Sequence, residues 1–537
     1  MDFAPSLEQA VADRRTFAII SHPDAGKTTL TEKLLLYSGM IHTAGMVKGR
    51  KGRKSAASDW MAMEQERGIS ITSSAMQFTY KEIIINILDT PGHEDFSEDT
   101  YRSLTAADCA IMVIDASKGV EKQTRKLFEI CRLRGIPVLT FINKMDMPCR
   151  DPFDLMHEVE NVLQIHSYAM NWPIGTAKDF QGVVDRATGE YVFFSKTSHG
   201  GAQRAEITRH LPQTPVEKDP VIQEKIGQEA TIQLLQELDL LAVAGNPFSQ
   251  AEFLAGKVTP VFFASALTNF GIEPFFDAFI HLAPCPHSRL ANRSDGTEIT
   301  IDPVNTPFSG YVFKLQANMD RRHRDSMAFI RICSGRFERD IVVKHHRLGK
   351  EIRLSRPHGM LAGERATVDF AFPGDIIGVI NPSTFAIGDT VSLTGGFVFK
   401  PLPQFQPEIF ARLQPKDIGK RKAFDKGILQ LIDEGAVQML RARHDENELI
   451  FAAVGQLQFE VMQYRLKDEY GVETALSPLP YHCSAWILGD LKTFSKPTNA
   501  ALVNDRQGRP MVLFTSQWEK QYCMKQNSNH ELVDVLV

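Results

Sequence analysis

The chain of 537 residues has little cysteine, and its seven cysteines show neither a Cys-x-x-Cys spacing nor a cluster with histidine. They are Cys109, Cys131, Cys149, Cys285, Cys333, Cys483 and Cys523. Such scatter argues against a disulfide framework and against the usual spacings of zinc sites. We therefore expect reduced and mostly buried thiols.

Long apolar runs are also lacking, since no segment approaches the roughly 18 apolar residues of a membrane span. The N-terminus, MDFAPSLEQAVADRR, has no apolar signal core, so we expect a cytoplasmic protein without a membrane partner. The net charge is only −5, which gives no general basicity for binding DNA or RNA. Any contact with nucleic acid is expected to be a local patch.

Residues 21–28, SHPDAGKT, are the stretch around which the chain is organised. They follow an apolar run and open a helical segment, which gives the order strand, tight loop, helix. In the phosphate loop G-x-x-x-x-G-K-[ST], backbone N–H groups cradle phosphates, the lysine reaches the outer phosphates and the hydroxyl binds Mg²⁺. Here a serine replaces the first glycine, and a simple turn before a helix is the competing interpretation. The predicted nucleotide-contacting residues are Ser21, His22, Pro23, Asp24, Ala25, Gly26, Lys27 and Thr28.

A second motif follows the apolar strand IIINIL at 83–88. This strand ends in Asp89, whose carboxylate is expected to approach the Mg²⁺ from the end of a neighbouring strand. The residues after it that we predict to line the nucleotide site are Thr90, Pro91, Gly92 and His93.

Two further motifs indicate a guanine base. One apolar strand ends in Asn143, Lys144, Met145 and Asp146. An asparagine on the purine edge, a lysine over the base and an aspartate that accepts two N–H groups would select guanine over adenine. Another strand ends in Ser265, Ala266 and Leu267, whose backbone N–H groups are placed for the guanine carbonyl. All four motifs therefore meet where open α/β sheets bind ligands, and they predict GTP or GDP with Mg²⁺.

A basic segment lies between the phosphate loop and Asp89, because five of the seven residues 48–54 are Lys or Arg. A solvated loop is the plain interpretation. The position instead favours a switch segment, which becomes ordered when it contacts the γ-phosphate and Mg²⁺ and is released after hydrolysis.

The motifs resemble those of the translational GTPases, a family that includes elongation factors Tu and G. The resemblance rests on ERGISI (66–71), DTPGHEDF (89–96), NKMD (143–146) and SAL (265–267). The longer strings HPDAGKTTLTEKLLLYSG and KGRKGRKSAASDWMAMEQERGISITSS are similar to the class II release factors of this family. The similarity extends over nearly the whole chain.

This resemblance implies roles for single residues. Lys27 and Thr28 would hold phosphates and Mg²⁺, and Gly92 would sense the γ-phosphate. Asp89 would act on the metal through a bound water. His93 would be the catalytic residue, which positions the attacking water.

The resemblance also implies an apolar gate, formed by Ile69 and Pro23, that keeps His93 withdrawn. Ser70 stands where the family commonly has a Mg²⁺-binding threonine, and Thr72 is the alternative. The implied metal ligands are Thr28, Ser70 and Asp89.

No obvious arginine finger stands in this chain. Arg67 is the one candidate, and an ion-pair partner in the switch segment is the preferred interpretation of it. A site without such a finger hydrolyses GTP slowly until a partner completes it. A large external activator is therefore implied.

The length predicts three or four domains. The motifs and the strand and helix patterns predict that they combine an α/β domain, a β-barrel and an α+β domain. We expect a P-loop GTPase domain at 1–290 with an insertion at about 160–255. Within the insertion, the pattern predicts a hairpin at 182–194 and an amphipathic helix at 220–242.

A linker is expected at 284–307, followed by an elongation-factor-type β-barrel at 305–400. The basic cluster 320–324 in this barrel is interpreted as an RNA or domain contact or as a solvated turn. A C-terminal α+β domain with a tail is expected at 405–537, with a helix at 420–440.

The resemblance implies a ribosome-stimulated GTPase of translation termination. Its GTP form would promote dissociation of class I release factors after peptide release, without reading stop codons. The implied partners are ribosomal RNA and proteins and the class I factors, and we expect a monomer. The alternatives are a GTP-dependent binding switch that the ribosome does not activate, a translocase, or a ribosome-protection factor. The short stretch after residue 480 disfavours the last two, which carry further domains.

Overall fold

The computed structural model describes residues 5–41, 72–195, 202–245, 247–317, 326–355, 357–361, 364–381, 383–402, 404–444 and 448–536. Some predictions lie outside these ranges: the basic segment 48–54, Arg67, Ile69, Ser70 and the cluster 320–324. In the described part of the chain, no helix combines the length and apolarity that crossing a membrane requires.

The N-terminal unit is built on a seven-stranded sheet that is parallel except for β2. In spatial order its strands are β2 (Ser74–Tyr80), β3 (Ile83–Asp89), β1 (Arg14–Ser21), β4 (Cys109–Asp115), β5 (Val138–Asn143), β11 (Val258–Phe263) and β6 (His166–Ala169). Successive side chains of a strand point to opposite faces. Phe17 and Ile19 therefore enter one apolar core, and Ala18 and Ile20 enter the other.

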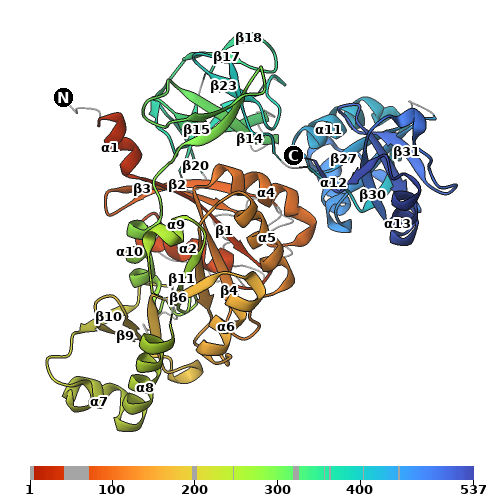
Figure 1. Ribbon diagram of the computed structural model, residues 1–537. Coiled ribbons are helices and arrows are strands. Elements are labelled where there is room, and N and C mark those ends of the chain that lie inside the picture. Colours follow the sequence, from red (N-terminus) through yellow and green to blue (C-terminus); the bar gives the residue numbers. More distant parts are fainter. Residues whose placement is uncertain are drawn as a thin grey trace.

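Helices cover both faces of this sheet (Figure 1). They are α2 (Lys27–Ser38), α4 (Ser97–Ala106), α5 (Lys122–Leu133), α6 (Pro152–Leu163), α9 (Gln250–Leu254) and α10 (Ile272–Leu282). The chain begins with a short helix, α1, which spans only Leu7–Ala12 because Arg14 already pairs with Ile84 in the sheet.

The insertion forms its own antiparallel sheet, at the end of the unit away from the barrel in Figure 1. Its strands are β10 (Glu206–His210), β9 (Tyr191–Ser195), β8 (Gly182–Asp185) and β7 (Asn171–Ile174). The predicted hairpin is confirmed by the pairing of β8 with β9. The single helix predicted at 220–242 is wrong: α7 (Pro220–Ile226) and α8 (Gln228–Ala244) are separated by Gly227, whose φ of 87° interrupts the helix.

The segment expected to be a linker is instead a hairpin of β12 (Arg289–Arg293) and β13 (Glu298–Ile301). The turn contains Gly296 at φ 84°, a conformation that favours glycine. β12 also pairs with β24 (Phe397–Phe399), so the chain enters and leaves the barrel at the same small sheet.

The barrel unit is an eight-stranded antiparallel sheet curved around an apolar core. Its strands are β18 (Lys350–Arg353), β17 (Val342–His345), β23 (Thr390–Ser392), β14 (Ser309–Ala317), β15 (Ser326–Ser334), β22 (Ile376–Ile380), β19 (His358–Leu361) and β20 (Glu364–Thr367). β14 and α4 lie against each other, which joins this unit to the first.

The C-terminal unit is a second eight-stranded antiparallel sheet with helices α11 (Arg421–Asp433), α12 (Gln456–Tyr470) and α13 (Gln517–Gln526). Its strands are β29 (Thr474–Pro478), β26 (Ile409–Pro415), β28 (Leu449–Ala453), β27 (Gln438–Ala442), β31 (Ala501–Asn504), β32 (Pro510–Phe514), β30 (Cys483–Leu488) and β33 (Glu531–Val533). The helix predicted at 420–440 ends earlier, before Gly435 at φ 76°. The stretch after residue 480, expected to be partly a tail, completes the sheet.

All seven cysteines are free thiols, and five of them are buried. The exceptions are Cys149, which is half-buried, and Cys285, which is exposed. The expectation of reduced, mostly buried thiols agrees with this arrangement.

Candidate nucleotide site

The phosphate loop connects the carboxyl end of β1 to the first turn of α2. Gly26 caps that helix at φ 99°, and a Cβ there would stand 2.2 Å from Asn143 Nδ2. Both the conformation and the space therefore require glycine. The loop presents the N-terminus of α2, whose free N–H groups and dipole favour phosphate.

Lys27 and Asp89 form a buried ion pair beside this loop. Lys27 Nζ lies 2.5 Å from Asp89 Oδ1, and the two side chains are 6% and 1% exposed. The other oxygen, Asp89 Oδ2, is buried without a hydrogen-bond partner in the described structure. Thr90 fixes the segment by donating from Oγ1 to the Ile19 carbonyl at 2.6 Å. Thr28, the predicted hydroxyl ligand, is half-buried in the first turn of α2, next to this lysine in the chain.

Asn143 connects the base-recognition strand ends to the phosphate loop. Its Nδ2 donates to the Ala25 carbonyl at 2.8 Å, and its Oδ1 accepts from the Ala266 backbone at 2.9 Å. Three of the predicted motifs are thus joined through one amide side chain.

Lys144 and Asp146 complete the predicted base site. Lys144 Nζ donates to the Asp24 carbonyl at 2.6 Å and lies 2.7 Å from Asp115 Oδ2. Asp146 Oδ1 is buried without a hydrogen-bond partner in the described residues. Burial of an unpaired carboxylate oxygen is costly, so this atom is suited to a ligand donor such as a guanine N–H.

The other predicted base-site residues differ in exposure. Met145, Ser265 and Ala266 are buried, whereas Leu267 is 42% exposed. The Leu267 side chain has no polar atom, so only its backbone can form hydrogen bonds.

Asp115 was missed as a site residue in the sequence interpretation. Burial alone would raise the pKa of its carboxyl, but hydrogen bonds from Lys144 and Ser117 hold that pKa below its ordinary value. It is thereby ionised and fixes the lysine. Its position at the carboxyl end of an apolar strand was the signal that identified the other site residues and would have identified Asp115.

His93 follows Gly92 and caps a short 3₁₀ helix, η1 (Glu94–Phe96). Its Nδ1 accepts a hydrogen bond from the Asp95 backbone at 3.3 Å, and its side chain is 37% exposed. Gly92 lies against Pro23, since a Cβ on Gly92 would be 3.5 Å from Pro23 Cα. The second motif therefore touches the phosphate loop.

Comparisons with known proteins agree with this arrangement. Residues 12–285 match the family described as "Elongation factor Tu GTP binding domain", and residues 307–394 match "Elongation factor G domain 2". Residues 399–524 match "Class II release factor RF3, C-terminal domain". A protein of Synechocystis sp. named peptide chain release factor 3 is 51% identical over 96% of this chain and 94% of its own length. The chain belongs to the peptide chain release factor 3 family.

Other relatives with that name cover the chain as completely. The Gloeobacter violaceus protein is 50% identical over 99% of both chains, and the Nostoc punctiforme protein is 51% identical over 96% of this chain and 94% of its own. A solved structure from Thermus thermophilus has the same fold at a TM-score of 0.67 and 20% identity, covering 91% of this chain and 72% of that one. This release factor 3 family member is a GTPase of translation termination.

Proposed function

We propose that the ribosome activates GTP hydrolysis by this protein and that its GTP form promotes departure of class I release factors after peptide release. Hydrolysis then lets the protein itself leave. The names of its relatives support a task in termination, and the nucleotide site supports a switch that GTP sets. We further propose that it acts as a monomer in the cytoplasm, with domains at 1–290, 305–400 and 405–537.

Two buried carboxylate oxygens support the nucleotide-binding part of the proposal. Asp89 Oδ2 and Asp146 Oδ1 both lack a hydrogen-bond partner among the described residues, one on the phosphate side and one on the base side. Unpaired buried acceptors are costly and rare in folded proteins. A guanine nucleotide with a divalent cation satisfies both at once, because the base offers N–H donors and the cation accepts oxygen ligands.

The residues present fit Mg²⁺. Asp89 Oδ2 is buried without a hydrogen-bond partner in the described part of the chain, and the Thr28 hydroxyl lies in the first turn of α2. These two would hold the ion, together with Ser70 or Thr72. When bound, the ion neutralises charge on the phosphate oxygens. Lys27 adds a positive charge, and the loop N–H groups orient the phosphates.

We assign the positioning of the attacking water to His93. It directly follows Gly92 at the phosphate loop, and its imidazole is partly exposed to solvent. Its Nδ1 is engaged with its own loop, so a rearrangement of that loop is required before the ring turns to the phosphate. Contact with the ribosome is the proposed cause.

The test is GTP turnover by His93→Ala with and without ribosomes. We expect ribosome-stimulated hydrolysis to fall about 10²- to 10³-fold, as when one group that acts on the transition state is removed. Nucleotide affinity should remain, because the base and phosphate contacts are untouched. His157→Ala, which changes an exposed histidine on α6, is the matched control and should keep full stimulation.

Release of a labelled class I factor from termination complexes tests the second half of the proposal. GTP-dependent release together with ribosomal stimulation supports it. Stimulation without release would keep the translational GTPase and remove the role in recycling. Hydrolysis that ribosomes do not change would favour the binding-switch alternative.

A further inference from the structure

The first residues of α12 rest on a carboxylate of the N-terminal unit. The Leu457 backbone nitrogen donates to Asp95 Oδ2 at 2.7 Å. Gly455, just before the helix, is so close that a Cβ there would stand 2.0 Å from Asp95 Cγ. Its φ of −145° suits any residue, so glycine is needed for space alone. Asp95 thus occupies the N-terminus of a 15-residue helix, where free N–H groups and the helix dipole favour negative charge.

Asp95 also contacts the proposed catalytic His93. Its backbone nitrogen donates to His93 Nδ1 at 3.3 Å, and its Oδ1 lies 3.4 Å from that same ring nitrogen. One carboxylate oxygen therefore faces the C-terminal unit and the other faces the imidazole. A displacement of α12 changes the position of Asp95 and, through it, the surroundings of His93.

A small apolar contact surrounds this link. Phe96, the residue after Asp95, packs against Val461 of α12, with Leu457 and Tyr464 beside them. Asp95 and Phe96 are consecutive residues of η1, and both contact α12. The C-terminal unit therefore holds the turn that follows His93 through two neighbouring side chains. Docking of α12 therefore favours the η1 conformation seen here.

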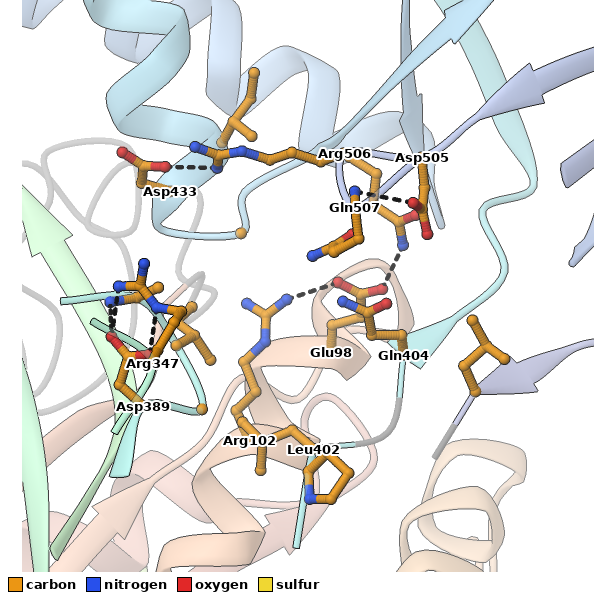
Figure 2. Close-up of a pocket in the computed structure, with 18 of the residues that line it drawn as sticks. Glu98, Arg102, Arg347, Asp389, Leu402, Gln404, Asp433, Asp505, Arg506 and Gln507 are labelled. Atoms are coloured by element: carbon orange, nitrogen blue, oxygen red, sulfur yellow. Dashed lines mark hydrogen bonds and ion pairs between the residues drawn. The ribbon is translucent and has the colours of Figure 1, made fainter. Parts of the chain in front are cut away.

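An open cavity of about 900 Å³ lies between α4, the barrel and the C-terminal unit. Figure 2 shows its charged walls, with Arg102 and Glu98 on α4 and Arg347 and Asp389 on the barrel. These charges are already paired, Arg102 with Glu98 at 2.9 Å and Arg347 with Asp389 at 2.6 Å. The cavity therefore leaves part of the boundary between α4 and the C-terminal unit unpacked.

We propose that Asp95 is a positioning residue that couples the docking of α12 to the orientation of His93. While α12 holds Asp95, the η1 turn keeps the imidazole on its own loop. When α12 moves away, the turn relaxes and His93 is free to reach the attacking water. This inference rests on the proposed role of His93 and adds the C-terminal unit as its regulator.

The test uses full-length protein and single-turnover GTP hydrolysis without ribosomes. A methyl group at Gly455 collides with the Asp95 carboxylate and breaks its contact with α12. We therefore expect the rate to rise about 5- to 10-fold, the size of a modest coupling between two sites. GTP affinity should stay unchanged, since no nucleotide contact is altered. Gly419→Ala is the control in the same unit, because a Cβ there meets only the Asp417 carboxylate, at 3.2 Å.

Two changes at Asp95 test the contact from the other side. Asp95→Ala removes the acceptor and should raise the rate as Gly455→Ala does. Asp95→Asn keeps a side-chain oxygen that accepts from Leu457 and should remain near the wild-type rate. If Gly455→Ala fails to fold, the rates of Asp95→Ala and Asp95→Asn alone test the coupling.

A merely structural effect is separated by repeating the measurement in the His93→Ala background. There we expect Gly455→Ala and Asp95→Ala to leave the rate unchanged, whereas general loosening would alter it in both backgrounds. If ribosome-stimulated hydrolysis requires His93 but neither variant changes the ribosome-free rate, the coupling is wrong and the proposed function stands. If His93→Ala keeps full ribosomal stimulation, the proposed function fails and the coupling fails with it.

Discussion

Asn143 Nδ2 donates a hydrogen bond to the Ala25 carbonyl at 2.8 Å and so ties the end of β5 to the phosphate loop. The same side chain accepts from the Ala266 backbone at 2.9 Å. Two buried hydrogen bonds of about 1 kcal/mol each are worth roughly 10- to 100-fold in affinity. We therefore expect Asn143→Ala to weaken both GTP and GDP binding by that factor, as measured by titration with a fluorescent nucleotide. Equal affinity for the variant and the wild type would show that the loop keeps its shape without this bridge.

Asp146 is the residue on which selection of guanine depends. Its Oδ1 is buried and without a partner in the described structure, as expected for an acceptor that awaits base N–H groups. An Asp146→Asn variant offers an amide donor in place of a carboxylate oxygen, so it should lose GTP and gain xanthosine triphosphate, which carries a carbonyl at that position. We expect GTP affinity to fall about 100-fold or more, because a site built for hydrogen bonds rejects a mismatched ligand strongly. Competition between the two nucleotides measures this exchange, and preserved preference for GTP would place the base elsewhere.

Removal of divalent cations tests Asp89. Its buried Oδ2, which has no partner among the residues that the structure describes, is the oxygen predicted to face the metal. A chelator should therefore lower the affinity of the wild type for GTP about tenfold or more, equivalent to roughly 1.4 kcal/mol. Asp89→Asn should bind GTP more weakly with Mg²⁺ present and show little further loss with the chelator. A variant that responds to the chelator as strongly as the wild type would mean that other residues hold the ion.

The nucleotide site could be predicted closely because its residues follow apolar strands whose carboxyl ends meet at one edge of a parallel sheet. Asn143, Lys144 and Asp146 are local in sequence, and their strand fixes where they lie. Asp95 and Leu457 could not be predicted as partners, because 362 positions separate two residues whose contact depends on how whole units dock. Their long separation leaves no periodic signal in the sequence.

The errors in element boundaries have the same kind of cause. A glycine inside an amphipathic pattern is compatible with a helix, and only the φ of 87° at Gly227 shows that the chain turns there. The Asp295-Gly296 pair is a hairpin signal, but the prolines and polar residues around it favoured a linker. In the structure, β12 also pairs with β24, a strand far along the chain, and this pairing holds the segment in a sheet.

The barrel is attached to the N-terminal unit through a buried carboxylate, Asp108, just before β4. Arg331 of the barrel lies 2.6 Å from its Oδ2, and Arg289 lies 3.2 Å from its Oδ1. The Asp108 side chain is fully buried, and removing one partner of such a group costs about 3–5 kcal/mol. We expect Asp108→Asn to lower the stability of the first two units by that amount, measured by calorimetry at neutral pH. Glu351→Gln, at an exposed position on β18, is the control and should have little effect.

The pH dependence of that loss identifies the ionised carboxylate as its cause. Burial alone would raise the pKa of Asp108, but Arg331, Arg289 and His287 together hold it below its ordinary value. A depressed pKa contributes stability that is complete above the unfolded value of about 3.9 and is lost as pH falls through the lower folded value. The difference in Tm between wild type and Asp108→Asn should therefore be constant from about pH 8 to 5 and should narrow below about pH 4. If the difference in Tm stays the same below about pH 4, the packing of the Asp108 side chain, and not its charge, holds the two units together.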